Sequence, residues 1–95
     1  MTHTRIIYTG KVQGVGFRWT CERLARDFPV AGYVQNQADG SVLLECEGEV
    51  DHVTAFLSAI DDAMGANING RDATQQQATG AFGNPTTPGC FRIKR

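Results

Sequence analysis

Several features that mark common protein classes are missing from this sequence. Its three cysteines, Cys21, Cys46 and Cys90, are odd in number and scattered, with no Cys-x-x-Cys pair. A disulfide framework or a structural zinc site is therefore not expected, and a reducing cytoplasm is the simplest setting. Cys21 and Cys46 fall at apolar positions of the pattern, which favours small buried side chains. The sequence does not determine the redox state of the three.

Neither sign of charge dominates, and no long apolar run is present. Nine lysine and arginine residues against ten aspartate and glutamate residues leave a formal net charge of −1. The basic surface that nucleic acids or acidic membranes attract is therefore missing. No stretch approaches the length of a membrane span, and the first residues lack the layout of a signal peptide. We expect a single domain over residues 1–95, monomeric, with no nucleic-acid or membrane partner.

Two segments have the periodicity of amphipathic helices. Residues 17–28 carry one apolar stripe, and Pro29 is expected to end this helix. In residues 50–64 apolar side chains recur at spacings of three and four. The two stripes consist of Phe17, Cys21, Leu24, Ala25 and Phe28, and of Val50, Val53, Phe56, Leu57, Ile60 and Met64.

Strand patterns fill most of the remaining chain. Strands are expected over residues 5–9, 30–36, 41–47 and 90–94. A turn at residues 37–40 joins the second and third into a hairpin, and the polar residues 67–77 are weakly patterned. This order predicts an α+β fold of the ferredoxin-like βαββαβ type: a four-stranded antiparallel sheet, plus a short C-terminal strand, with two helices on one face.

The loop between the first strand and the first helix is rich in glycine. Gly14 and Gly16 can adopt backbone angles closed to other residues, so successive N–H groups can surround one anion. The start of the helix adds unpaired N–H groups and the positive end of its dipole. Arg18 lies in the first turn of the helix, where the positive end of the dipole mildly repels a cation. A phosphoryl group bound between the guanidinium and the loop would explain why an arginine stands there. The loop is predicted to bind phosphate.

Other interpretations of this loop compete with that prediction. Many glycine-rich turns between a strand and a helix bind nothing, and spacing alone leaves both possible. Gly10-Lys11 is not followed by the Gly-Lys-Ser/Thr of a nucleotide-binding loop. Gly14-Val15-Gly16 lacks the third glycine of a dinucleotide-binding motif. A nucleotide is therefore not the expected ligand.

Two blocks of residues resemble the acylphosphatase family. They are Gly10-x-Val12-Gln13-Gly14-Val15-x-Phe17-Arg18, and Gly32-Tyr33-Val34-Gln35-Asn36 followed by Gly40-x-Val42 and Gly48. The similarity continues through Val53, Phe56 and Leu57 to Phe91-x-Ile93. It implies a ferredoxin-like fold and hydrolysis of the carboxyl–phosphate bond of acyl phosphates. Arg71 and Ala73 stand where the family's fourth strand usually has valines, so the register of that strand is not implied.

The resemblance also implies a set of site residues. Arg18 corresponds to the phosphate-binding arginine and Asn36 to the asparagine that holds the attacking water. The phosphate loop corresponds to the main chain of Gln13, Gly14, Val15, Gly16 and Phe17. A side-chain amide takes up no proton at ordinary pH, so Asn36 is expected to aim the water, and a substrate oxygen is expected to take its proton.

No metal or cofactor is expected. A carboxylate leaves readily at neutral pH, so the reaction requires no general acid. We expect that neither a metal nor a covalent intermediate is involved. No cluster has metal-ligand spacing, and both His3, near a floppy terminus, and His52, on the second helix, are expected at the surface. Trp19 is either a wall of the site or a partly buried aromatic residue at the base of the helix.

Two other functions compete with acyl phosphate hydrolysis. A non-catalytic regulatory module would keep the phosphate loop without turnover. RNA binding would follow from the fold alone, but the aromatic stacking motif is absent from the central strands. Similar domains also begin larger hydrogenase-maturation carbamoyltransferases, yet no zinc-finger cysteines follow here, which favours a free-standing enzyme. The physiological acyl phosphate cannot be named from the sequence.

Overall fold

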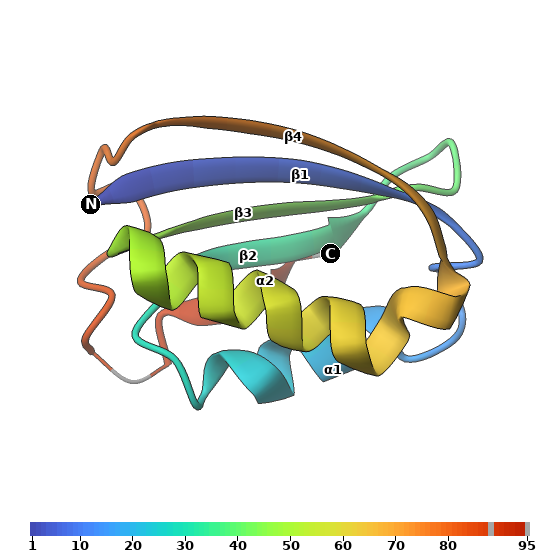
Figure 1. Cartoon of the computed structure of the whole chain (residues 1–95), viewed down its shortest axis with the longest axis horizontal. Coiled ribbons are helices and arrows are strands. Elements are labelled where there is room, and N and C mark those ends of the chain that lie inside the picture. The colour runs from blue at the N-terminus through green and yellow to red at the C-terminus, as the bar shows by residue number, and fades with distance from the viewer. Residues whose placement is uncertain (88, 95) are drawn as a thin grey trace.

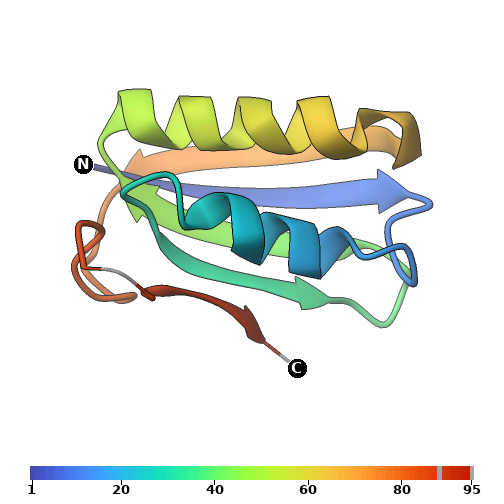
Figure 2. The ribbon, with the colours of Figure 1, turned by 90° about the horizontal axis from the view of Figure 1, so that it is seen from below.

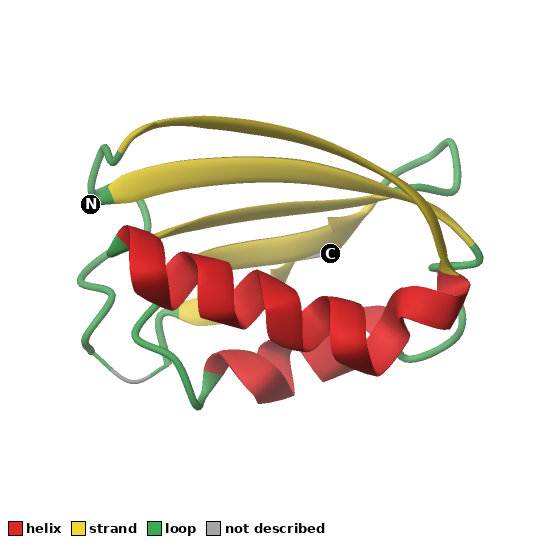
Figure 3. Ribbon diagram, viewed as in Figure 1, coloured by secondary structure: helices red, strands yellow, loops and turns green. Residues whose placement is uncertain are grey.

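Five strands form one sheet, and two helices cover one of its faces (Figures 1 and 3). The computed structural model describes residues 1–87 and 89–94. The strands are β1 (Thr2–Gly10), β2 (Ala31–Asn36), β3 (Val42–Gly48), β4 (Ile68–Gln77) and β5 (Phe91–Lys94). The helices are α1 (Phe17–Ala25), α2 (Val50–Met64) and the short 3₁₀ helix η1 (Gly65–Asn67). Across the described ranges, no helix is long and apolar enough to cross a bilayer.

The strand order in the sheet is β4-β1-β3-β2-β5. β1 pairs antiparallel with both β3 and β4, so that Ile6 lies opposite Leu44 on one side and Ala73 on the other. β2 and β3 form the expected antiparallel hairpin. The ferredoxin-like arrangement is therefore confirmed. β5 pairs parallel with β2, which makes the complete sheet mixed.

The core lies between the sheet and the two helices. Its largest fully buried side chains include Tyr8, Phe17, Phe56, Leu44 and Ile60. The Tyr8 and Phe17 rings are 5.0 Å apart between centroids, so the end of β1 packs directly on the start of α1. The predicted apolar stripes are largely confirmed, except that Val50 at the start of α2 is exposed. This packing holds the segment between β1 and α1 at both of its ends.

The first helix is shorter than predicted. It ends at Ala25 instead of Phe28, and the next three N–H groups bond to carbonyls only three residues back, at 3.0–3.3 Å. This tighter turn has a local cause, because Pro29 disfavours the helical conformation of the residue before it. β1 is longer than predicted and begins at Thr2, because β3 and β4 both pair with it along its length.

β4 is an edge strand with little apolar content. Ile68 is its one fully buried residue, and the strand is exposed from Arg71 onward. An ion pair of 2.8 Å between Arg71 Nε and Asp61 Oδ1 links it to α2, but both groups are about two-fifths exposed, so the pair contributes little to stability. The weak pattern of residues 67–77 therefore has a structural reason: β4 has one neighbouring strand and buries little of its surface.

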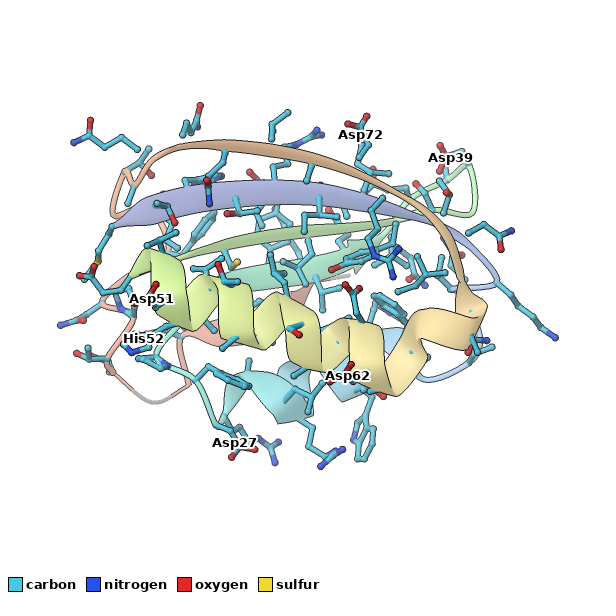
Figure 4. The ribbon with its side chains drawn as sticks, in the orientation of Figure 1. Asp27, Asp39, Asp51, His52, Asp62 and Asp72 are labelled. Carbon is cyan, nitrogen blue, oxygen red and sulfur yellow. The ribbon has the colours of Figure 1, made fainter. Side chains whose placement is uncertain are left out.

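The molecule has two ends with different loops (Figure 2). The β1–α1 loop (residues 11–16) and the β2–β3 turn (residues 37–41) lie together at what we call the loop end. The N-terminus, the start of α2 and the segment after β4 lie at what we call the distal end. Figure 4 shows Asp51 and His52 near the distal end and Asp39 at the loop end.

Candidate active site

The β1–α1 loop has the backbone that its glycines predict. Gly14 and Gly16 have φ values of 75° and 80°, in the left-handed region that other residues rarely adopt. A Cβ atom at either position would meet nothing within 4 Å, so glycine is required there by conformation and not by space. Gly16 is also the N-cap of α1 and makes no side-chain cap. The first N–H groups of the helix are therefore left to a ligand or to water.

Hydrogen bonds from two neighbouring segments fix the loop in place. The Gln13 side chain donates through Nε2 to the carbonyl oxygens of Gln37 and Ser41, at 2.8 and 2.9 Å. On the other side, the Lys11 N–H donates to the Asn67 carbonyl at 2.9 Å. Gly10 lies so close to η1 that an added Cβ would come within 2.5 Å of the same oxygen. The loop is thus attached to both the β2–β3 turn and η1.

A cavity of about 180 Å³ opens beside this loop. It is lined by Val12, Gly14, Gly16, Phe17, Arg18, Trp19, Asn36 and Ile93. The structure therefore brings together most of the predicted site residues, including Arg18 and Asn36, which are far apart in the sequence. Two of the predicted loop residues lie outside the lining: Gln13 attaches the loop to the β2–β3 turn, and Val15 packs against the core.

Asn36, which lines this cavity, has an unsatisfied polar atom. It is the last residue of β2, and its Oδ1 atom is buried without a hydrogen-bond partner among the described residues. A buried acceptor in that state costs about 1–3 kcal/mol, which a bound donor such as water can offset. Asn36 is therefore suited to accept a hydrogen bond from a molecule in the cavity.

Arg18 and Trp19 are adjacent residues in the first turn of α1. In the part of the chain that the structure describes, the Arg18 guanidinium has no carboxylate within ion-pair distance. Trp19 is 60% exposed, so the expectation of a partly buried residue at the helix base is wrong, whereas the alternative of a wall of the site agrees with its place in the lining. Ile93 and Val12 were not expected in the site. The Phe91-x-Ile93 alternation of the family pattern was the one signal for Ile93.

His3 does not lie on the surface, contrary to expectation. It is 7% exposed in β1, because the strand continues to Thr2 and is paired on both sides. Its Nδ1 is 2.7 Å from Glu47 Oε2 and its Nε2 is 2.8 Å from Glu45 Oε1. Both partners are carboxylates, so both ring nitrogens donate and the geometry fits the charged imidazolium. Burial lowers the pKa of His3, but the hydrogen bonds to Glu47 and Glu45 outweigh it and raise the pKa overall.

Glu47 is the centre of this distal polar cluster. Glu47 is 1% exposed. Its carboxylate accepts bonds of 2.8–2.9 Å from the Thr79 N–H, the Thr79 hydroxyl and the Gly80 N–H, in addition to the bond from His3. Burial raises the pKa of Glu47, but these bonds outweigh it and lower the pKa to about 2. The cluster fastens the segment after β4 to the sheet and shares no residue with the cavity.

A larger hollow of about 480 Å³ lies at the other end of α1, between Arg26 and Arg92. None of the predicted site residues lines it. His52 is exposed, as expected, and Figure 4 shows it on α2 near the distal end. In the ranges that the structure describes, no three His, Cys, Asp or Glu side chains are grouped closely enough to hold a metal ion.

Known proteins share this fold and this sequence pattern. A family model described as Acylphosphatase matches residues 4–85. The chain belongs to the acylphosphatase family. The match includes both blocks of the sequence pattern, and with them Arg18 and Asn36. It confirms the resemblance, and it ends before β5, the strand that supplies Ile93 to the cavity.

Members of the acylphosphatase family match nearly the whole chain. The acylphosphatase of Salinibacter ruber is 39% identical over 88 residues, which are 92% of this chain and 86% of that protein. The crystal structure of acylphosphatase from Bacillus subtilis has a TM-score of 0.83 and 27% identity, and covers 100% of both chains. The crystal structure of T. kodakarensis HypF matches with a TM-score of 0.77 and 26% identity over all of this chain, but only over 12% of its own.

Proposed function

We propose that the protein is an acylphosphatase that hydrolyses the carboxyl–phosphate bond of acyl phosphates to a carboxylate and inorganic phosphate. One observation carries the proposal. Arg18, in the first turn of α1, and Asn36, at the end of β2, line the same cavity beside the glycine loop, and the Oδ1 of Asn36 has no hydrogen-bond partner among the described residues. A cation, a hydrogen-bond acceptor and a helix start thus meet at one point. The names of the curated relatives support the same activity.

In this proposal the phosphoryl group binds to the main-chain N–H groups of Gln13 to Phe17 and to the Arg18 guanidinium. The N-cap residue Gly16 leaves the first helical N–H groups without a side-chain partner. Oriented N–H groups and one arginine stabilise the negative charge of the transferring group without reorganising during the reaction. The donors are held in advance, because the loop is attached to the β2–β3 turn and η1.

Asn36 has a separate role, which is to aim the attacking water. Its buried Oδ1 accepts a hydrogen bond from the water, and the water oxygen then forms a bond to phosphorus. The bond between phosphorus and the acyl oxygen breaks, and the carboxylate leaves with the electron pair. The proton of the water passes to a phosphoryl oxygen, because a carboxamide does not take up a proton at ordinary pH.

We further propose that neither a metal ion nor a covalent enzyme intermediate takes part. The leaving carboxylate is stable at neutral pH, so neither a general acid nor a metal is needed to stabilise it. Among the described residues, the side chains that line the cavity include no serine, cysteine, histidine or carboxylate that could attack phosphorus. Water aimed by Asn36 is therefore the nucleophile that these residues allow.

Phosphate release from acetyl phosphate and benzoyl phosphate tests the proposal. We expect hydrolysis that persists in EDTA and is inhibited competitively by inorganic phosphate. Arg18→Gln should lower kcat/KM at least about 10³-fold, as loss of an arginine that stabilises a transferring phosphoryl group does elsewhere. Arg26→Gln, which removes an exposed arginine at the other end of the same helix, should leave the rate unchanged.

The same experiment separates catalysis from binding alone. If the wild-type protein binds phosphate, with affinity lost in Arg18→Gln, but hydrolyses neither substrate above background, the non-catalytic regulatory module is the correct interpretation. If neither binding nor hydrolysis depends on Arg18, the site assignment is wrong.

We also propose that the protein acts as a monomer in the cytoplasm. Its three cysteines are free, and burial raises the pKa of Cys21 and of Cys46 to about 12, which keeps both as neutral thiols. Such thiols are compatible with a reducing compartment. Light scattering of the purified protein should give the mass of one chain, and a concentration-dependent increase in mass would contradict the proposal.

A further inference from the structure

Trp19 is an exposed aromatic residue beside the candidate active site. Three large hydrophobic side chains of the described residues are well exposed: Met1, Val50 and Trp19. Of these, Trp19 is the one that lines the cavity with Arg18 and Asn36. Tryptophan is buried on average, so an exposed tryptophan in the lining of a polar cavity is available to contact a ligand.

The indole ring is held in position although it is not buried. Arg23, one helical turn after Trp19, places its guanidinium carbon 5.3 Å from the ring centroid. A cation over a tryptophan face is attracted by the ring and restricts its motion. One side of the indole is thus occupied by Arg23, while the residue still contributes to the cavity lining.

Three other apolar residues line the cavity. Phe17 belongs to α1, as Trp19 does, whereas Ile93 belongs to β5 and Val12 to the β1–α1 loop. β5 pairs with β2, the strand that ends at Asn36, and Ile93 of β5 lines the same cavity as Trp19 of α1. The cavity thus has an apolar part and a polar part, and the polar part is formed by Arg18, Asn36 and the loop amides. An acyl phosphate likewise has an apolar acyl group and a charged phosphoryl group.

We propose that Trp19, together with Ile93, binds the acyl group of the substrate and favours acyl phosphates with an aromatic acyl group over those with a small one. The inference rests on the proposed function, because it places the phosphoryl group at Arg18 and the loop. A planar acyl group that extends from that position meets the indole of the adjacent residue. Stacking of two aromatic groups adds affinity beyond the burial of apolar area. An acetyl group has no aromatic ring and gains no affinity from stacking.

Kinetics with two substrates provide the first test. We expect Trp19→Ala to lower kcat/KM for benzoyl phosphate about tenfold, mainly by raising KM. The kcat/KM for acetyl phosphate should change little. Trp19→Phe should retain most of the preference for benzoyl phosphate over acetyl phosphate, and Ile93→Ala should lose part of this preference. Inhibition by inorganic phosphate, which has no acyl group, should be unchanged. Val50→Ala, at an exposed apolar residue outside the cavity, is the matched control.

A binding measurement gives a readout that does not depend on turnover. Trp19 is the only tryptophan of the chain, so intrinsic fluorescence reports on it alone. Benzoylphosphonate and acetylphosphonate, in which a carbon–phosphorus bond resists hydrolysis, are the probes. Benzoylphosphonate should shift or quench the emission, whereas acetylphosphonate and inorganic phosphate should not. Calorimetry should show that Trp19→Ala binds benzoylphosphonate about tenfold more weakly than the wild-type protein does.

The outcomes distinguish this inference from the proposed function. Equal losses for both substrates in Trp19→Ala would mean that Trp19 positions Arg18, and would overturn the inference while the proposed function stands. Benzoylphosphonate binding with a change in emission, but no hydrolysis of either substrate, would overturn the proposed function and leave the acyl-binding surface in place. Unchanged emission with saturating benzoylphosphonate would refute the acyl-binding surface whatever the activity.

Discussion

The two ends of the sheet (Figure 2) differ in whether their buried polar groups have hydrogen-bond partners. At the loop end, Asn36 Oδ1 is buried with no partner among the described residues. At the distal end, Glu47 accepts four hydrogen bonds and both ring nitrogens of His3 are bonded to carboxylates. A satisfied polar group supports the fold, whereas an unsatisfied one is stabilised when a ligand binds. We therefore expect the distal end to support the fold, and we propose the loop end as the site of the chemistry.

The largest expected effect is on stability at the distal end. Glu47→Ala would leave the Thr79 and Gly80 N–H groups without their acceptor and would remove one of the two partners of His3. Breaking a buried charged network by removing one member costs about 3–5 kcal/mol. Urea unfolding should show this loss, while the folded fraction should keep the wild-type kcat for acetyl phosphate.

Glu49→Ala is the matched control, because Glu49 is exposed two residues further along the chain and should change the free energy of unfolding by less than about 0.5 kcal/mol. If Glu47→Ala lowered kcat as strongly as it lowered stability, the two ends would not be separate in function.

The next effect is on activity at the loop end. If Asn36 aims the attacking water as we propose, Asn36→Ala should lower kcat about 10²-fold, while the inhibition constant of inorganic phosphate should change little. The substitution also removes a buried acceptor that has no partner, so the free energy of unfolding should stay the same or rise. Asn69→Ala, in the exposed edge strand β4, is the control. A parallel loss of phosphate affinity and kcat would instead place Asn36 on the phosphoryl group.

The loop end was the easier part to predict from the sequence. Its signals are local in the sequence: Gly14 and Gly16 indicate positive φ angles, and Arg18 follows two residues later in the first turn of the helix. The pairing of Arg18 with Asn36 came from the family resemblance, since no spacing rule joins a helix start to the end of a later strand. The apolar stripe of α2 predicted that helix correctly from Val50 to Met64.

The distal end could not be predicted, because its contacts are not local. His3 meets Glu45 and Glu47 more than 40 residues later, and Thr79 meets Glu47 across 32 residues. In the sequence, Glu47 is only one polar residue in an alternating strand. Its burial depends on the segment after β4, which has no regular pattern. Trp19 was misjudged for a related reason, because the period of a helix does not indicate where a neighbouring cavity exposes an aromatic ring.

The smallest expected effect is a pH dependence of stability that comes from the distal cluster. The pKa of Glu47 is lowered from 4.5 to about 2, so its contribution is complete above pH 4.5 and is lost as the pH falls toward 2. The pKa of His3 is raised above 6.5, so its contribution is complete below pH 6.5 and is lost as the pH rises through the folded-state value. The cluster therefore stabilises the fold most between about pH 4.5 and 6.5.

Comparison of two histidine variants tests this pH dependence. Two further groups act on the cluster. Burial raises the pKa of Glu45, but the hydrogen bonds from Tyr33 and His3 and the nearby charges of His3 and Arg5 outweigh it and lower the pKa overall. Burial and the bond to Glu45 raise the pKa of Tyr33 to about 12, so Tyr33 stays neutral across this pH range. The free energy of unfolding of the wild-type protein should therefore fall by on the order of 1 kcal/mol between pH 5.5 and 8.5, and His3→Gln should abolish the fall. His52→Gln, at the exposed histidine of α2, should preserve it. If the wild type and His3→Gln had the same slope, the imidazolium between two carboxylates would be refuted, and the distal end would depend on its uncharged hydrogen bonds alone.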